Sequence, residues 1–164
     1  MKILNVGCGK DTYGTDFLDL YPERDNIKKC NLDQDRFPYD DDIFDEVYSK
    51  NNFEHLANPS NFLSESKRVL KKGGRIMIIT DNAGYYGFFG TAHYGGHEAA
   101  HKDNPDDRHY AVFTPTHMKN WLEKFKFNKI EVKYEISDPR DWKLKLAVRI
   151  NRKLHQQLIA TGIK

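Results

Sequence analysis

The feature that most constrains the fold of this 164-residue chain is a series of short apolar runs. Each run stops at a polar or glycine-containing loop. Five such runs occupy residues 2–6, 16–20, 27–31, 45–49 and 75–80. Apolar runs of this length, bounded by turn residues, are typical of buried strands in a parallel sheet. A further segment, residues 129–136, alternates strictly between apolar and charged side chains, which predicts a half-solvated strand at a sheet edge.

Two helices are predicted between these strands. The first begins at Asn58, a suitable N-cap, and Pro59, and it closes at Gly73. The second covers residues 114–125, where large apolar side chains recur at helical spacing. Strands that alternate with helices predict an α/β fold: a Rossmann-like, doubly wound, mostly parallel sheet of six or seven strands with helices on both faces.

The sequence predicts one domain, in which residues 1–136 form the main part and residues 137–164 a basic amphipathic C-terminal segment. Two structures compete for this segment. Its Ser-Asp-Pro start and Gly162 favour a helix, whereas the apolar alternation over residues 144–150 suits a final strand. The capping signals favour the helix.

Positive charge gathers in the same C-terminal segment. From Lys143 to Lys164 there are six basic and no acidic residues. A solvated basic face is the simplest interpretation, and the alternatives are a membrane surface, an anionic partner or a homodimer contact through residues 139–160.

Composition excludes several classes of protein. The net charge of +2 does not indicate a polyanion as partner, and no apolar stretch approaches the length of a membrane span. Cys8 and Cys30 are too few for a disulfide framework or a zinc site built from thiolates. Free thiols suit a reducing compartment, so a cytoplasmic location without a signal peptide is predicted.

The strongest motif for chemistry is Gly7-Cys8-Gly9, directly after the first strand. Glycines at such a turn allow the backbone to approach a ligand closely. A nicotinamide-dinucleotide fingerprint requires a third glycine and a following helix, but Thr12 occupies that position. Because residues 10–15 are also too short for a helix, a nicotinamide-dependent dehydrogenase is disfavoured.

Further motifs follow this loop in a fixed order. They are Asp19, Asn31-Leu32-Asp33, Phe37-Pro38-Tyr39, then Phe-Asp-Glu-Val-Tyr at 44–48, Asn-Phe-Glu-His-Leu at 52–56 and Arg-Val-Leu-Lys-Lys-Gly-Gly at 68–74. Over residues 2–136 this order resembles the compact subgroup of class I S-adenosylmethionine-dependent methyltransferases. The chain departs from that pattern where residues 10–15 replace the usual helix, and no seventh strand is evident after Ile136.

The resemblance implies S-adenosyl-L-methionine as the cofactor and a set of residues that bind it. The glycine loop would lie behind its methionine and ribose portions, the first aspartate would bind the ribose hydroxyls, the leucine–aspartate pair would frame the adenine, and the two asparagines would line the methionine end. These residues are Gly7, Cys8, Gly9, Asp19, Leu32, Asp33, Asn51 and Asn52.

The methyl acceptor is predicted to be a small molecule, and residues 82–113 are its expected binding face. This loop is long, rich in tyrosine and histidine, and its early glycines suit a lid. An acceptor that must lose a proton needs a base that titrates near neutrality. The candidate catalytic residues are His109, His93 and His55.

No metal site is predicted. His93, His97 and His101 are four residues apart, but Gly95 and Gly96 interrupt the helix that would place them on one face.

Nucleic acid is not expected as a partner either, since the chain lacks an alternating aromatic and basic platform. The Asn-Pro-Pro-Tyr-like tetrad of base amino-group methylation is also absent at residues 49–52. The remaining alternative to an enzyme is a non-catalytic module that binds S-adenosylmethionine or another protein, because fold alone does not fix function.

Overall fold

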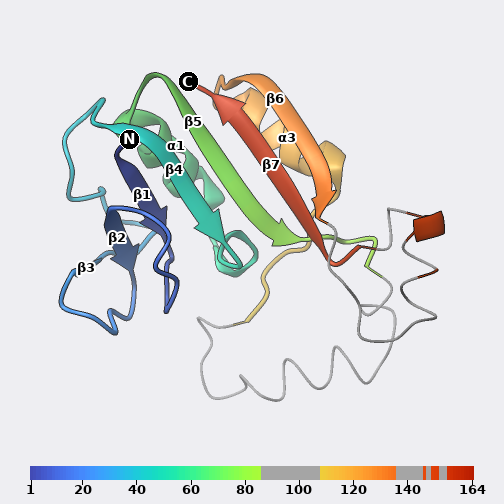
Figure 1. Cartoon of the computed structure of the whole chain (residues 1–164), viewed down its shortest axis with the longest axis horizontal. Coiled ribbons are helices and arrows are strands. Elements are labelled where there is room, and N and C mark those ends of the chain that lie inside the picture. The colour runs from blue at the N-terminus through green and yellow to red at the C-terminus, as the bar shows by residue number, and fades with distance from the viewer. Residues whose placement is uncertain (86–107, 136–145, 147–148, 152–154) are drawn as a thin grey trace.

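The computed structural model describes residues 1–85, 108–135, 146, 149–151 and 155–164. Its centre is one seven-stranded sheet with the order β3-β2-β1-β4-β5-β7-β6 (Figure 1). The strands are β1 Ile3–Val6, β2 Asp16–Asp19, β3 Ile27–Lys29, β4 Phe44–Lys50, β5 Leu70–Asp81, β6 Asn128–Glu135 and β7 Gln157–Ile163. The five apolar runs and the alternating segment each form the strand that the sequence predicts, and β6 lies at the sheet edge as expected.

Strands β1 to β5 are parallel to their neighbours, and β7 runs antiparallel to both β5 and β6. The carboxyl ends of β1, β2, β4 and β5 therefore meet at one edge of the sheet (Figure 1). Ligands of open parallel sheets bind at this edge. The mostly parallel, Rossmann-like sheet is thus confirmed, with seven strands.

The α-helices α1 Pro59–Val69 and α3 Pro115–Lys124 lie behind the sheet in Figure 1. Each has a buried apolar stripe, for example Phe62 and Leu63 on α1 and Met118 and Leu122 on α3. Both stripes belong to one core with strand side chains that point to the same face. A 3-10 helix, η1 Phe53–His55, follows β4 directly.

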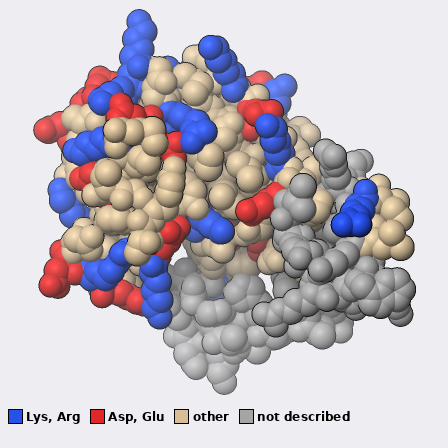
Figure 2. Space-filling view, in the orientation of Figure 1, with Lys and Arg blue, Asp and Glu red and all other residues tan. Residues whose placement is uncertain are grey.

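On the opposite sheet face, no helix lies between β1 and β2. Residues 10–15, between β1 and β2, form a loop as the sequence predicts. Here the Tyr13 hydroxyl donates a hydrogen bond to the buried Glu46 carboxylate at 3.0 Å, and Arg75 pairs with the same carboxylate. Acidic and basic side chains are interspersed on this side of the molecule (Figure 2).

The first helix ends earlier than its sequence predicts. Gly73 was expected to close it, but α1 stops at Val69 and the chain is extended from Leu70 onward. Leu70 pairs with Phe44 of β4 and is fully buried, while Lys71 reaches the Asp45 carboxylate at 2.6 Å. Burial of Leu70 and its strand pairing override the helix-ending signal of the glycines.

The C-terminal segment contains a strand that neither sequence alternative located. Residues 157–163 form β7, between β5 and β6, so the helix predicted up to Gly162 is wrong over this stretch. Most of residues 137–154 lie outside the described part of the chain. Among the described residues, no helix is long and apolar enough to cross a membrane.

Arg68, near the end of α1, holds the loop between β3 and β4 against this helix through hydrogen bonds. Its guanidinium donates hydrogen bonds to the Glu65 carboxylate, to the Asp41 carboxylate and to the backbone oxygens of Phe37 and Tyr39, at 2.6 to 3.0 Å. The arginine of the 68–74 motif is therefore structural, and its only role visible in the described residues is to hold this loop against α1.

Replacement of Arg68 by alanine should destabilise the fold by about 3 kcal/mol, because the largely buried Glu65 carboxylate would lose its cation. Arg36 is the matched control. It also pairs with Asp41 but is 72% exposed, so Arg36→Ala should cost less than about 0.5 kcal/mol. Urea unfolding of both variants measures the difference, and equal stabilities would contradict this role for Arg68.

Candidate functional site

The loop after β1 holds its backbone against β2. The N–H groups of Gly7 and Cys8 both donate to the Leu18 carbonyl oxygen, at 2.8 and 3.1 Å. Gly7 has a φ of +68°, and a Cβ at this position would lie 2.2 Å from the Asn52 side chain. Glycine is therefore required here both by conformation and by the close approach of the loop after β4.

Asp19, the last residue of β2, is fixed by two backbone donors. Its Oδ2 accepts from the N–H of Gly9 at 2.7 Å, and its Oδ1 accepts from the N–H of Tyr21 at 2.9 Å. Each carboxylate oxygen has a second lone pair. The carboxylate is thus oriented beside the glycine loop and retains the capacity to accept two more hydrogen bonds.

Asp33, in the loop after β3, ties that loop to the start of α1. Its carboxylate accepts from the N–H of Asn58 at 2.7 Å and from the N–H of Ala57 at 3.3 Å. The Asn58 amide also donates to the Asp33 backbone oxygen at 3.0 Å. Asp33 therefore has a structural role at this loop, whatever ligand contact it also makes.

The loop after β4 is shaped by two asparagines. Asn51 has a φ of +50°, a left-handed conformation that asparagine tolerates better than most residues. The Asn52 amide donates to the buried Ser49 hydroxyl at 3.2 Å, which in turn donates to the Val6 carbonyl at 2.8 Å. This relay joins the ends of β1 and β4.

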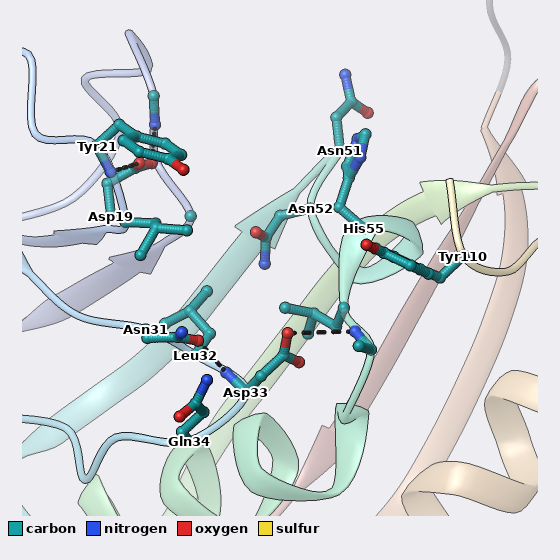
Figure 3. Close-up of a pocket in the computed structure, with 15 residues that line it drawn as sticks. Asp19, Tyr21, Asn31, Leu32, Asp33, Gln34, Asn51, Asn52, His55 and Tyr110 are labelled. Carbon is teal, nitrogen blue, oxygen red and sulfur yellow. Dashed lines mark hydrogen bonds between the residues drawn. The ribbon is translucent and has the colours of Figure 1, made fainter. Parts of the chain in front are cut away.

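A pocket of about 390 Å³ lies between these loops, at the carboxyl edge of the sheet (Figure 3). Its lining residues are Gly7, Gly9, Asp19, Leu20, Tyr21, Asn31, Leu32, Asp33, Gln34, Asn51, Asn52, His55, Leu56, Ala57 and Tyr110. Of the cofactor residues that the sequence predicts, all but Cys8 line it. Figure 3 shows Asp19 and Tyr21 on one side of the pocket, with Asn51, His55 and Tyr110 on the other.

Cys8 differs from its neighbours because its side chain points into the fold. It is 5% exposed and packs in a small cluster with Phe17 and Ile27. Burial raises the pKa of the Cys8 thiol to about 11, so the thiol stays protonated and unreactive at neutral pH. Only the backbone of Cys8 takes part in the loop geometry described above.

Sequence reasoning missed several residues of the pocket wall, above all Tyr21 and Gln34. Tyr21 lies two residues beyond Asp19, and its backbone N–H orients that carboxylate. An aromatic residue two positions after a strand-ending aspartate is a signal that would have indicated it. Gln34 has no comparable signal.

The histidine candidates fall into two groups. His55 and His109 lie together, with ring centroids 4.7 Å apart, whereas His93 lies outside the described residues. The His109 Nδ1 atom lies 3.6 Å from the Asp81 carboxylate at the end of β5, and both side chains are about nine-tenths buried. His55 lines the pocket, so this histidine pair adjoins its Asn51 and Tyr110 side.

Glu54 completes this cluster beneath the histidines. It is 1% exposed, and its Oε2 accepts a hydrogen bond from the Thr80 hydroxyl at 2.8 Å. Burial, with a smaller effect of the nearby Asp81 charge, raises the pKa of Glu54 to about 7. A buried carboxyl group of this kind beside a pocket is typical of functional sites.

The sheet order, with its antiparallel β7, and a pocket beyond β1, β2 and β4 define the class I methyltransferase fold. A family model described as a methyltransferase domain matches residues 1–132, which is most of the chain. The chain belongs to this family and is an S-adenosylmethionine-dependent methyltransferase. No curated protein sequence matches it.

Solved structures share the fold at low sequence identity. A methyltransferase from Mesorhizobium loti is 17% identical with a TM-score of 0.68, and the alignment covers 99% of this chain and 90% of that one. One from Archaeoglobus fulgidus is 16% identical with a TM-score of 0.66, over 99% and 86% of the two chains. A Haemonchus contortus phosphoethanolamine N-methyltransferase, in complex with S-adenosyl-L-methionine, is 16% identical with a TM-score of 0.62; this chain is covered completely and spans 49% of that protein.

Proposed function

We propose that this chain transfers a methyl group from S-adenosylmethionine to a small-molecule acceptor. The single observation that carries the proposal is the pocket itself. An oriented carboxylate, Asp19, stands at one end, and His55 stands at the other beside a buried cluster of titratable groups. Such an arrangement suits a polar nucleoside at one end and an acceptor that gives up a proton at the other.

The residues present fit the cofactor. Asp19 would accept hydrogen bonds from the two ribose hydroxyls. The backbone of Gly9 would lie against the ligand, because the space that a Cβ would take there is open. Leu32 would pack on the adenine ring, and Asn51 and Asn52 would line the methionine end.

The protein contributes to the reaction mainly by orienting the reactants and by excluding water from the site. When bound, S-adenosylmethionine provides a methyl group that its sulfonium already activates. The chain orients the acceptor in line with that group and excludes water. His55 and His109 are the candidates, among the residues that the structure describes, for taking up the proton of the acceptor. The His109 ring is the more firmly oriented of the two, because the Asp81 carboxylate faces its Nδ1.

A small acceptor is favoured over a polyanionic polymer by charge, because basic and acidic side chains mix on the face seen in Figure 2. We further propose a cytoplasmic location, which the free, buried thiols of Cys8 and Cys30 support.

The test combines binding with turnover. Calorimetry should show that S-adenosylmethionine binds and NAD does not, and a panel of small hydroxyl, amine and carboxylate compounds should include one that yields S-adenosylhomocysteine. With that acceptor, His109→Gln should lower kcat by about 100-fold or more and leave the Kd for S-adenosylmethionine within a few-fold.

His117→Gln is the matched control, since His117 is exposed on α3 and does not line this pocket. Its kcat should match that of the unaltered chain. Binding without turnover across the panel would favour the non-catalytic module, and binding of NAD alone would overturn the proposal.

A further inference from the structure

Glu54, His55 and His109 each place one ligand atom within 4.8 Å of the other two. We propose that these three residues bind a first-row divalent transition-metal ion, such as Zn²⁺ or Mn²⁺. The sequence predicts no such site, because the histidines that it spaces regularly, at 93, 97 and 101, are different ones.

The backbone brings the three residues together. Glu54 and His55 are adjacent in η1, directly after β4. His109 arrives from a distant segment that docks on η1, where the N–H groups of Tyr110 and Ala111 donate to the Glu54 carbonyl at 2.8 and 3.3 Å. The docking bonds hold the His109 ring over η1 independently of any ligand.

Each histidine has the supporting partner that metal-bound histidines commonly have. The His55 Nδ1 lies 3.1 Å from the Arg108 carbonyl oxygen, and the His109 Nδ1 lies 3.6 Å from the Asp81 carboxylate. A carbonyl or carboxylate at one ring nitrogen fixes the ring and makes the other nitrogen the better ligand. We therefore assign Nε2 of both rings to the metal.

Glu54 provides the third ligand, through its deprotonated carboxylate. Its carboxylate is buried, and Thr80 donates to one of its oxygens. Asp81, also buried, adds a second carboxylate to the same cluster. A metal bound by Glu54 and the two imidazoles would stabilise carboxylate charge in this buried setting.

The types of ligand atom indicate which metal ions the site would bind. Two imidazole nitrogens and one carboxylate oxygen suit Zn²⁺, Mn²⁺ or Fe²⁺ and disfavour Mg²⁺ and Ca²⁺, which prefer oxygen ligands. Around Zn²⁺ the ligand atoms would lie roughly 3.4 Å apart, so small side-chain rotations would have to close the cluster. Three protein ligands leave coordination positions for a substrate.

The role of the metal, though not its existence, rests on the proposed function. His55 lines the pocket, so an ion at its ring faces the acceptor end. An acceptor hydroxyl bound to the ion loses its proton to water more readily. Its oxygen then bonds to the methyl carbon, and the electron pair of the broken carbon–sulfur bond stays on sulfur. His55 and His109 would act as ligands in this step, and an acceptor with an ionisable oxygen is the class expected.

Metal binding can be measured without turnover, on the full chain without a polyhistidine tag. After chelation and dialysis, Zn²⁺ is titrated by calorimetry and Mn²⁺ by electron paramagnetic resonance. We expect one ion per chain at this site, with Mg²⁺ much weaker. Glu54→Gln, His55→Gln and His109→Gln should each weaken binding by at least about 100-fold, and Asp81→Asn by about 10- to 100-fold.

His117→Gln should bind the metal as the unaltered chain does, because His117 lies on α3 outside the cluster. Binding of S-adenosylmethionine by each variant shows that its fold is intact. Should the cluster variants not fold, the unaltered chain gives a second measurement: Zn²⁺ should raise its Tm, and Mg²⁺ should not. Unchanged metal affinity in folded cluster variants, or no rise in Tm, would overturn the site.

The two proposals fail in different ways. If the metal binds at the cluster but no acceptor is methylated, the proposed function fails and the site stands. If methyl transfer occurs at an undiminished rate in excess chelator, His109 acts as a base and the role assigned to the metal fails, while the proposed function stands.

Discussion

Removal of residues 156–164 is expected to unfold the chain. β7 pairs with seven residues of β5 and with six of β6, so its loss would separate β6 from the sheet. Leu158 and Ala160 of β7 are fully buried in the core beneath α3. The two exposed strand edges and the open core would leave no stable sheet. Circular dichroism and a thermal melt of the shortened chain test this directly.

Two point variants separate burial from strand pairing. Leu158 faces the helix-covered core, whereas its neighbour Ile159 faces the opposite side of the sheet and is only partly buried. Leu158→Ala should cost about 2–5 kcal/mol in the free energy of unfolding, and Ile159→Ala about 1 kcal/mol or less. A shortened chain that melts cooperatively, or equal costs for the two variants, would contradict a central role for β7.

The fold was largely predictable because its strands are short apolar runs with clear ends. β1 and the 75–80 part of β5 are such runs, and the strict alternation of β6 indicated its edge position. β7 was missed because it contains small and polar residues, and because Gly162 suggested the end of a helix. In the sheet, Gly162 instead makes room for Phe127, whose Cβ would lie 2.9 Å from a Cβ at this position.

The nucleoside end of the site was predictable for the same reason. Gly7, Asp19 and Asn52 lie at or just beyond the ends of β1, β2 and β4, so locating the strands located the residues. What the sequence could not indicate is what each side chain does in the folded chain. The Asp33 carboxylate accepts backbone hydrogen bonds from residues 57 and 58, and the Cys8 thiol is buried.

The acceptor end was not predictable, because its members are distant in sequence and meet only through tertiary contacts. Glu54 lies in η1 after β4, and Asp81 is the last residue of β5. His109 reaches them because the backbone N–H groups of residues 110 and 111 donate hydrogen bonds to η1. His109 and His55 were each candidates on other grounds. Their contact with one another and with Glu54 depends on the docking of that segment, which no local pattern encodes.

Asp19→Ala is expected to weaken S-adenosylmethionine binding by about 100-fold or more. Hydrogen bonds from ribose hydroxyls to a carboxylate contribute about 1.5–3 kcal/mol each, and both would be lost. The same change also removes the acceptor for the N–H groups of Gly9 and Tyr21, so the glycine loop would lose its orientation. Calorimetry with S-adenosylmethionine measures the effect, with a thermal melt to show that the variant folds.

Asp16→Ala is the matched control, because Asp16 is the first residue of the same strand and lies at the end away from the pocket. Its binding should stay within a few-fold of the unaltered chain. Asp19→Asn distinguishes the two roles of Asp19: its amide oxygen still accepts from one backbone N–H, but its NH₂ group opposes the other donor. We expect an intermediate loss for this variant. Unaltered affinity in both Asp19 variants would mean that the nucleoside does not contact β2, and the pocket would then have to bind its ligand between β4 and the loop after β3.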